Sequence, residues 1–419
     1  MEPTRRILSL PRSLSSLILL ISATVPLAIA GPALTDDSQC GCYRINDDSS
    51  TYFTHHRFFD FRSLPQYAGV PTVIQDVEAS ADADPTSDYF KDSEWSSFWY
   101  LGSWNNSNGA REDATVTMVN SPNNVYIEAN TEDNPSSQTY LTLRTQRLKE
   151  FQTAAEIESS SSKFKYLSLR MRARTVGAGG AITALFTYRG GETLADVQEA
   201  DLEIRTDDPR NALHYTNQPA YTDDGVVISE ATRNVTMPNG LDWTAWAVHR
   251  LDWTPGLTTW YVDDVIVAQI EFQAPRDESN IILNAWSDGG RWTGNMTLYD
   301  AAYLQVQWLE VLYNSTEAVA TEQSSSSSLS SGSEEDKKKM KKRKKMNKRC
   351  KKRGDDNSGG GGGCDAVCSI DETSEVGTPV MLWNNSPPQT NGNSRRVEMG
   401  SVPTGVVSAM ALFSIALLV

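Results

Sequence analysis

Residues 167–174 read LSLRMRAR, and their side chains alternate in polarity along the whole stretch. Leu167, Leu169, Met171 and Ala173 occupy every second position, with a serine and three arginines between and after them. Successive side chains of a β-strand point to opposite faces of the sheet, so an alternation of period two places one face against a core. The stretch therefore predicts a half-buried strand.

The same alternation recurs outward from this stretch in both directions. It is found in residues 140–143, 181–188, 246–253 and 304–308. Residues 258–270 (TTWYVDDVIVAQI) hold two β-branched and aromatic runs separated by Asp263 and Asp264, as in a hairpin. No long apolar pattern of helical period lies between these segments. The sequence predicts an all-β domain, a large β-sandwich over residues 40–315.

Three acidic residues stand out in residues 196–204 (DVQEADLEI). Glu199, Asp201 and Glu203 are spaced by two, so on a strand their carboxyls share one face while the apolar residues between them enter the core. Like charges in a row repel one another, and folding alone gives no reason to place them there. Such a row raises at least one carboxyl pKa, as an acid and base pair requires. A merely solvated acidic strand is the alternative interpretation.

The residues around this row resemble glycoside hydrolase family 16, the concanavalin A-like lectin/glucanase fold, in a fungal-looking version. Glu199-Ala-Asp201-Leu-Glu203 is similar to the family's Glu-x-Asp-x-Glu signature. The resemblance extends over residues 53–313. It includes residues 153–159 (TAAEIES), 164–172, 251–263 (LDWTPGLTTWYVD), 281–292 (IILNAWSDGGRW) and 304–313.

The resemblance implies a jelly roll of two curved antiparallel sheets with a glycan cleft on the concave one. It implies Glu199 as nucleophile, Glu203 as general acid/base and Asp201 as the residue that orients the nucleophile, in a retaining reaction on β-glucans. A retaining pair needs carboxyls about 5 to 5.5 Å apart, whereas residues i and i+4 of a flat strand lie about 13 Å apart. The strand must therefore curve. Two departures from the family pattern are Asp264 in place of a glycine and His249 in the segment before Asp252.

Several functions remain open at this stage. Water or a second sugar could complete the reaction, which decides between a hydrolase and a transglycosylase. A catalytically inactive, lectin-like β-glucan-binding protein is the alternative of a different class, and a structural wall protein is a third. A serine hydrolase is disfavoured because no Gly-x-Ser-x-Gly motif is present.

Eleven tryptophans are available to pack in the core or to stack on sugars. We assign Trp253, Trp260 and Trp308 to the core because they lie within strand patterns. The predicted substrate-binding residues, in segments that could line the cleft, are Trp95, Trp99, Trp104, Trp286 and Trp292. No metal site is predicted at the adjacent His55 and His56, and no cofactor is predicted; a structural calcium ion remains open.

Charge and cysteine content narrow the class of protein further. The net charge is −15, but thirteen basic residues lie in residues 337–353, so the rest of the chain carries −28. A surface this acidic argues against nucleic-acid binding. The basic run has three interpretations: a solvated linker, a contact with acidic wall polymers, or a processing site. No cysteine lies between Cys42 and Cys350, and the pairing of the five cysteines remains open.

Both ends of the chain carry targeting features. Residues 1–30 combine basic residues, an apolar run and small residues at the end, as in a secretory signal peptide. Residues 320–392, rich in serine, lysine and glycine, are expected to form a low-complexity stalk. Residues 393–419 resemble a GPI-attachment propeptide, with attachment at Gly392. An uncleaved N-terminal anchor and a C-terminal tail anchor are the alternatives.

These features predict an extracellular protein at the cell surface or cell wall, held to the outer membrane leaflet by a lipid anchor. We expect a monomer with a β-glucan polysaccharide as its partner. Four Asn-x-Ser/Thr sequons predict N-glycosylation at Asn105, Asn234, Asn295 and Asn314, on surfaces away from the cleft.

Overall fold

The computed structural model describes residues 32–45, 51–222, 224–317, 364–373 and 375–385. Within these ranges the chain is mostly β-strand, and its α-helices, α1 (Val77–Ala81) and α2 (Ser93–Ser96), are short. Single turns of 3-10 helix connect several strands; they are η1 (Asp37–Gln39), η2 (Pro65–Tyr67), η3 (Asp88–Lys91), η4 (Pro122–Asn124), η5 (Leu194–Asp196), η6 (Ser229–Ala231) and η7 (Pro238–Gly240). The all-β prediction is confirmed.

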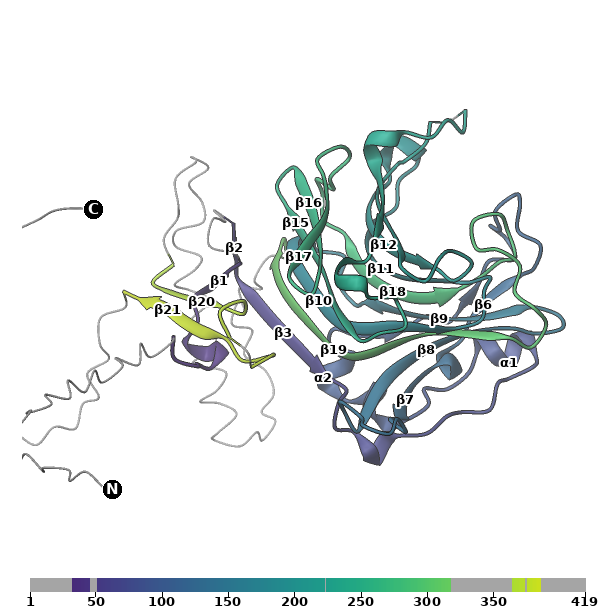
Figure 1. Cartoon of the computed structure of the whole chain (residues 1–419), viewed down its shortest axis with the longest axis horizontal. Helices are drawn as coiled ribbons and strands as arrows, with labels where there is room; N and C mark the ends of the chain where they lie inside the picture. The colour runs from purple at the N-terminus through teal and green to yellow at the C-terminus, as the bar shows by residue number, and fades with distance from the viewer. Residues whose placement is uncertain (1–31, 46–50, 223, 318–363, 374, 386–419) are drawn as a thin grey trace, which may run out of the picture. The chain divides into compact units, whose positions relative to one another are not determined.

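The first sheet, sheet I, is antiparallel with the order β14–β13–β12–β11–β18–β9–β4. Its strands are β4 (Trp99–Leu101), β9 (Gln152–Ser159), β11 (Ile182–Arg189), β12 (Gln198–Arg205), β13 (Ala212–Gln218), β14 (Thr232–Thr236) and β18 (Asn280–Trp286). Figure 1 shows β11, β12 and β18 above the layer that contains β10, β19 and β8.

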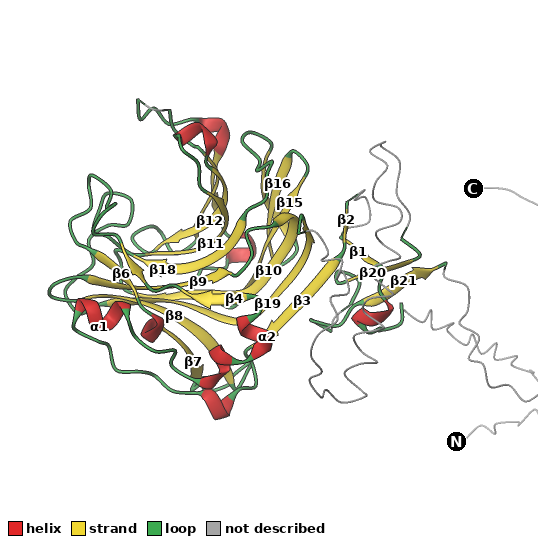
Figure 2. Ribbon diagram, turned by 180° about the vertical axis from the view of Figure 1, so that it is seen from behind, coloured by secondary structure: helices red, strands yellow, loops and turns green. Residues whose placement is uncertain are grey.

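The second sheet, sheet II, has the order β17–β16–β15–β10–β19, and β19 then pairs with β3 along one half and with β8 along the other. Its strands are β3 (His55–Asp60), β7 (Val125–Ala129), β8 (Thr139–Arg147), β10 (Phe164–Gly177), β15 (Ala247–Thr254), β16 (Leu257–Val262), β17 (Val265–Ile270) and β19 (Ala301–Ser315). The short strands β5 (Trp104–Asn105) and β6 (Met118–Asn120) pair beside β9, and in Figure 2 the helices α1 and α2 lie below β8 and β19.

The main core lies between the two sheets. On β10, the predicted inward residues Leu167, Leu169, Met171 and Ala173 are each at most 1% exposed and belong to this core. Trp253 and Trp260 join the same core, while Trp308 is buried on the outer face of β19, where Arg170 lies over its ring. The sandwich therefore forms by burial of the period-two faces that the sequence shows.

The predicted hairpin is confirmed as β16 and β17. Its turn residues Asp263 and Asp264 both adopt positive φ, at 46° and 64°. A tight hairpin turn needs this left-handed backbone at both central residues, and aspartate tolerates it better than most non-glycine residues. Asp263 also accepts a hydrogen bond from Val248 N, which ties the turn to the start of β15.

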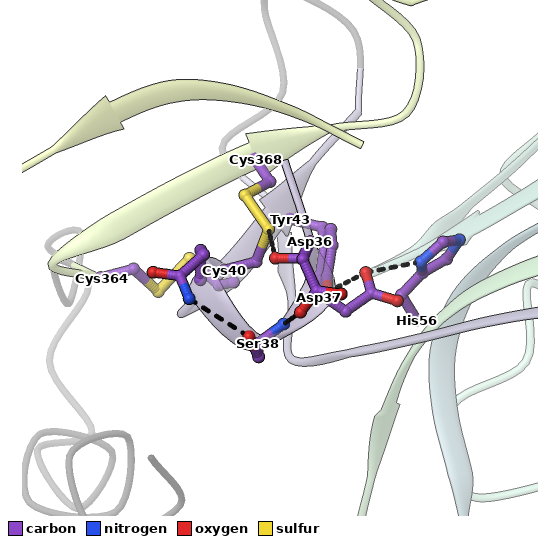
Figure 3. Close-up of a disulfide and its surroundings, with 10 residues drawn as sticks. Asp36, Asp37, Ser38, Cys40, Tyr43, His56, Cys364 and Cys368 are labelled. Atoms are coloured by element: carbon purple, nitrogen blue, oxygen red, sulfur yellow. Dashed lines mark hydrogen bonds and ion pairs between the residues drawn. A yellow bond between two sulfur atoms is a disulfide. The ribbon is translucent and has the colours of Figure 1, made fainter. Parts of the chain in front are cut away.

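A small third sheet, the terminal sheet, joins the two ends of the described chain. Its order is β2–β1–β20–β21, from β1 (Cys42–Arg44), β2 (Tyr52–Phe53), β20 (Ala366–Ser369) and β21 (Val380–Asn384). Disulfides Cys40–Cys368 and Cys42–Cys364 hold it together (Figure 3).

These strands correct the prediction of a stalk over residues 320–392. β20 is a four-residue run, too short to stand out in a low-complexity segment, and its parallel partner β1 lies more than 300 residues earlier. Local sequence patterns therefore did not reveal the pairing. Cys350 lies outside the described residues.

The terminal sheet sits against the outer face of sheet II through a set of charges, most of them buried, called the outer charge cluster. Its members are Asp37, His56, Arg170, Arg250, Asp252, Glu310 and Asp371. His56 lies 2.8 Å from Asp37 Oδ1 and 2.9 Å from Glu310 Oε1, and Arg170 Nε donates to Glu310 Oε2 at 2.7 Å. Positive and negative groups alternate throughout the cluster, so each buried charge is compensated.

The predicted signal peptide, the basic run, Gly392 and the GPI propeptide all lie outside the described residues. In the part of the chain that is described, no helix has the length and apolarity needed to cross a membrane.

Candidate active site

Strand β12 carries the three predicted acids on one face of sheet I. Ala200, Leu202 and Ile204 point into the main core and are at most 2% exposed. Because side chains alternate along a strand, Glu199, Asp201 and Glu203 point to the opposite face, away from sheet II. We call this face of sheet I the acidic face.

The register of the neighbouring strands defines what surrounds each acid. Glu199 lies between Tyr188 and Gln218, Asp201 between Phe186 and Thr216, and Glu203 between Ala184 and His214, on β11 and β13 respectively. These cross-strand neighbours contribute mainly aromatic, amide and hydroxyl groups. None of the three acids forms an ion pair with a described cationic residue.

Few hydrogen-bond donors reach the three carboxyls. Trp292 Nε1 donates to Glu203 Oε1 at 3.2 Å, and Gln218 Nε2 donates to Asp201 Oδ2 at 3.4 Å. The other oxygen of Asp201 is buried and receives no hydrogen bond from any described donor. Asp201 and Glu199 are close enough to hydrogen-bond when one of them is protonated. A proton on Asp201 that is donated to Glu199 satisfies both carboxyls.

Burial and mutual repulsion shift the proton affinities of this trio upward. Burial raises the pKa of Glu199 to about 7; the hydrogen bond with Asp201 partly offsets this, and the charge of Glu203 adds to it. Burial and the charges of both glutamates raise the pKa of Asp201 well above its usual value. Burial also raises the pKa of Glu203, against the opposing effects of the Trp292 N–H and of nearby positive charge. At neutral pH the trio therefore holds fewer than three negative charges.

This arrangement can perform acid/base chemistry. Glu199 and Glu203 lie on either side of Asp201, whose pKa is raised well above its usual value. One ionised carboxylate and one protonated carboxyl can coexist at the same pH when the environment separates their proton affinities. The local folding reason is simple: the alternation of β12 commits one face to the core and leaves the other face for the acids.

Two of the predicted substrate-binding tryptophans are wrong. Trp95 and Trp99 are each 1% exposed and pack in the main core against Phe59 and Phe98. Their segment, α2 and β4, packs against β3 and pairs with β9, which sequence position alone does not reveal. A buried indole ring in this core cannot stack on a sugar.

The other three tryptophans lie at the acidic face. Trp104 is 43% exposed, and its Nε1 donates to Glu156 at 2.7 Å. Trp286 is in register with Ile182 and Arg205, which places it on the same face as Glu203. Trp292 reaches Glu203 directly. These three remain predictions for substrate binding.

The prediction from sequence missed a second pair of acids on the same face. Glu156 and Glu158 of β9 are in register with Asn284 and Ile282, and through β18 and β11 with Glu203 and Asp201. Burial raises the pKa of Glu156 to about 7, and Glu158 accepts hydrogen bonds from Tyr100 and Asn280. The spacing by two in TAAEIES is the same signal that identified Glu199, Asp201 and Glu203.

Comparison with known families supports the assignment of this region. Residues 112–308, which include the whole acidic row, match the model of glycosyl hydrolases family 16. Over these residues the chain is similar to family 16. The predicted family resemblance agrees with this match.

Two curated proteins that are similar to this chain are named Beta-glucanase. The protein from Paenibacillus polymyxa is 26% identical over 139 residues, and the one from Paenibacillus macerans is 25% identical over 139 residues; each alignment covers 32% of this chain. The chain thus spans 54% of the length of the relatives it matches.

Solved structures also align with this chain. The Bacillus licheniformis β-glucanase covers 52% of this chain and 92% of its own, with a TM-score of 0.41 and 21% identity. A β-1,3-1,4-glucanase (lichenase) derived from a mouse hindgut metagenome covers 62% of this chain and 99% of its own, with a TM-score of 0.42 and 17% identity.

Proposed function

We propose that the protein cleaves the glycosidic bonds of a β-glucan by a retaining double displacement. Glu199 is the nucleophile, Glu203 the general acid/base, and Asp201 the residue that positions Glu199. The single observation that carries the proposal is the row of three carboxyls on β12, with Asp201 buried and Glu199 and Glu203 half-buried, without an ion-pair partner among the described residues, and raised in pKa. The β-glucanase names of the matched relatives support the choice of substrate.

In the first step, an ionised oxygen of Glu199 attacks the anomeric carbon of the sugar. The bond from that carbon to the glycosidic oxygen breaks, and the leaving oxygen takes the proton of Glu203. A covalent ester between Glu199 and the sugar results. Asp201 donates its proton to Glu199 in a hydrogen bond, which holds the attacking carboxylate in one orientation.

In the second step, Glu203 is ionised and removes a proton from an incoming hydroxyl. The oxygen of that hydroxyl attacks the anomeric carbon, and the carboxylate of Glu199 leaves. Two inversions restore the β configuration. Water as the incoming group gives hydrolysis, and a sugar hydroxyl gives transglycosylation; both remain within the proposal.

The acidic face offers surfaces for binding a sugar chain. Trp104, Trp286 and Trp292 present indole rings that can stack on the apolar faces of pyranose rings. Glu158, Tyr100 and Asn280 form a polar group on the same face that can bind sugar hydroxyls. These groups come from β4, β5, β9, β18 and the segment after β18. We therefore propose that the glucan runs across the strands of sheet I.

We also propose that the protein acts outside the cell, in cell-wall polysaccharide metabolism, with a GPI anchor at Gly392. The signal-like residues 1–30 and the propeptide-like residues 393–419 support this location. Treatment of intact cells with a phospholipase that cleaves GPI anchors should release the protein into the medium. Retention in the membrane after treatment would instead indicate a tail anchor.

The decisive experiment uses the secreted protein and a panel of β-1,3, mixed-linkage and chitin-derived oligosaccharides, with products identified by mass and anomer. We expect cleavage or transfer on a β-glucan with retention of the β configuration. Glu203→Gln should still react with substrates whose leaving groups need little protonation, while ordinary glucans react far more slowly. Inversion would overturn the mechanism, and binding without turnover of any substrate would favour the lectin-like alternative.

A further inference from the structure

A sequon lies on the acidic face itself. Asn234 begins Asn-Val-Thr on β14, the edge strand of sheet I. The register pairs Asn234 with His214, and His214 with Glu203. His214 Nδ1 and Asn234 Oδ1 lie 2.8 Å apart, so both side chains point to the same face as Glu203. Two steps between strands separate Asn234 from Glu203, a distance of about 10 Å at the Cα atoms.

This position differs from those of the other sequons. The amide of Asn314 is used within the fold: its Nδ2 donates to Tyr52 O, and its Oδ1 accepts from Thr54. Asn105 follows Trp104 on β5 and points to the opposite side of that strand, since Trp104 reaches Glu156. Asn295 is exposed in the segment after β18. Asn234 is the sequon that the register places on the acidic face, and its side chain is exposed.

We propose that Asn234 carries an N-linked glycan, and that this glycan blocks the β14 end of the acidic face against long polysaccharide chains. The role in substrate selection rests on the proposed function, whereas the modification does not. It changes one expectation from the sequence, that glycans mark surfaces away from the cleft. Short oligosaccharides that end before β14 would bind freely, and polymers that must extend past β13 would compete with the glycan.

The modification is a transfer from a lipid-linked oligosaccharide during secretion. Asn234 Nδ2 forms a bond to the anomeric carbon of the first sugar, the bond from that carbon to the lipid diphosphate breaks, and one amide proton is lost to a base. The lipid diphosphate is the leaving group. Oδ1 takes no part in the new bond, so the contact with His214 can persist.

The two ends of the acidic face differ in the side chains that they expose. At the β4 and β5 end, Tyr100 and Trp104 are 45% and 43% exposed and offer aromatic surface to a sugar. At the β14 end, Thr232, Asn234 and Thr236 are polar or modified, and no described tryptophan lies on β13 or β14. A bulky, hydrated glycan attached there excludes other chains from its volume. The acidic face is therefore open at one end and restricted at the other.

The test separates the glycan from the side chain that bears it. Thr236→Ala removes the sequon and keeps Asn234 beside His214, whereas Thr236→Ser keeps the sequon. Each protein is secreted from a host that adds N-glycans, and kcat/KM is measured on a long β-glucan and on a short oligosaccharide. We expect the polymer-to-oligosaccharide ratio to rise roughly three- to tenfold in Thr236→Ala, as removal of a flexible competitor predicts, and to stay unchanged in Thr236→Ser.

Controls identify the cause of any change. Asn295→Gln removes a different sequon and should leave the ratio unchanged. Asn234→Gln removes both the glycan and the His214 contact. If its polymer-to-oligosaccharide ratio equals that of Thr236→Ala, the effect is due to the glycan. Mass analysis of the wild-type peptide must show a modified Asn234, and an unmodified residue would overturn the proposal.

An unchanged ratio in Thr236→Ala would also overturn the proposed role. If the wild-type protein turns over no substrate, the proposed function fails. The block is then tested by binding, through the ratio of the dissociation constants for the polymer and for the oligosaccharide. A higher relative affinity for the polymer in Thr236→Ala would still support the block. Equal ratios of affinity would reject it.

Discussion

Sheet I and sheet II each bury acidic side chains, but the charged groups around these acids differ between the two sheets. Glu310 on β19 is fully buried between His56 and Arg170, and these partners lower its pKa despite the effect of burial. On β12, Asp201 is buried between the half-buried Glu199 and Glu203, and the pKa values of all three rise. A buried charge with partners of opposite sign is costly to remove, because its partners would then be left uncompensated. A cluster of like charges instead destabilises the fold. The contrast separates an acid whose charge is compensated within the fold from the three acids that we propose as the catalytic residues.

The largest expected effect tests the chemical side of this contrast. Glu199→Gln should lower kcat/KM on a β-glucan by more than about 10,000-fold, because an amide cannot attack the anomeric carbon. Its melting temperature should stay equal or rise, since one repelling charge is removed. Glu192→Gln, an exposed residue outside the row, is the control and should keep full activity. Undiminished activity in Glu199→Gln would return the three acids to the status of a charged strand face.

Glu310→Gln tests the structural side. It leaves Arg170 and His56 buried without their shared carboxylate, which should lower the free energy of unfolding by about 3–5 kcal/mol. Urea denaturation measures the loss, and the exposed Glu271→Gln serves as the control. Activity per folded molecule should be preserved. A variant as stable as the wild type would show that the outer charge cluster does not hold the terminal sheet in place.

The same cluster predicts a pH dependence of stability. Burial disfavours the charged ring of His56, but its hydrogen bonds to Asp37 and Glu310 outweigh this and raise its pKa to about 9. The folded state therefore binds the proton more tightly than the unfolded chain, whose histidine pKa is about 6.5. This stabilisation, about 3 kcal/mol, is complete below pH 6.5 or so and is lost as the pH rises to about 9. Thermal melts from pH 6 to 10 should show the decline, and His56→Gln should flatten it.

Asp201 is expected to give the smallest change. Asp201→Ala removes the hydrogen bond to Glu199 and should lower kcat by roughly 10- to 100-fold, the worth of a hydrogen bond to a charged group. Asp201→Asn should lose less, because its amide can still donate. Because its raised pKa favours the neutral form, Asp201 adds little like-charge repulsion, so Asp201→Asn should leave the melting temperature close to that of the wild type. A loss of stability in both would mean that Asp201 supports the fold instead.

Local alternation made most of the sandwich and the acidic row predictable from sequence. The strand of residues 167–174 and the hairpin around Asp263 and Asp264 follow from patterns within ten or so residues. The same rule placed Glu199, Asp201 and Glu203 on one face before any neighbour was known.

What could not be predicted depends on contacts distant in sequence. Trp95 and Trp104 lie nine residues apart and have opposite exposures. The ring of Trp95 in α2 packs against Phe59 in the main core, whereas Trp104 lies on β5, which pairs with β6. The proximity of Asn234 to Glu203 depends on the register of β12, β13 and β14. Strand β20 needs a partner from the other end of the chain. None of these contacts leaves a periodic signal.

The two disulfides also fix the covalent topology of the protein. The bridge between Cys42 and Cys364 closes a ring of the backbone that contains the entire sandwich, and the Cys40–Cys368 bridge closes a second ring around it. Hydrolysis of one peptide bond inside these rings, including any in the basic run of residues 337–353, opens them without releasing a fragment. A nicked molecule would migrate as one species until its disulfides are reduced. Proteolytic damage between the sandwich and the terminal strands would therefore leave the sandwich and its C-terminal segment joined.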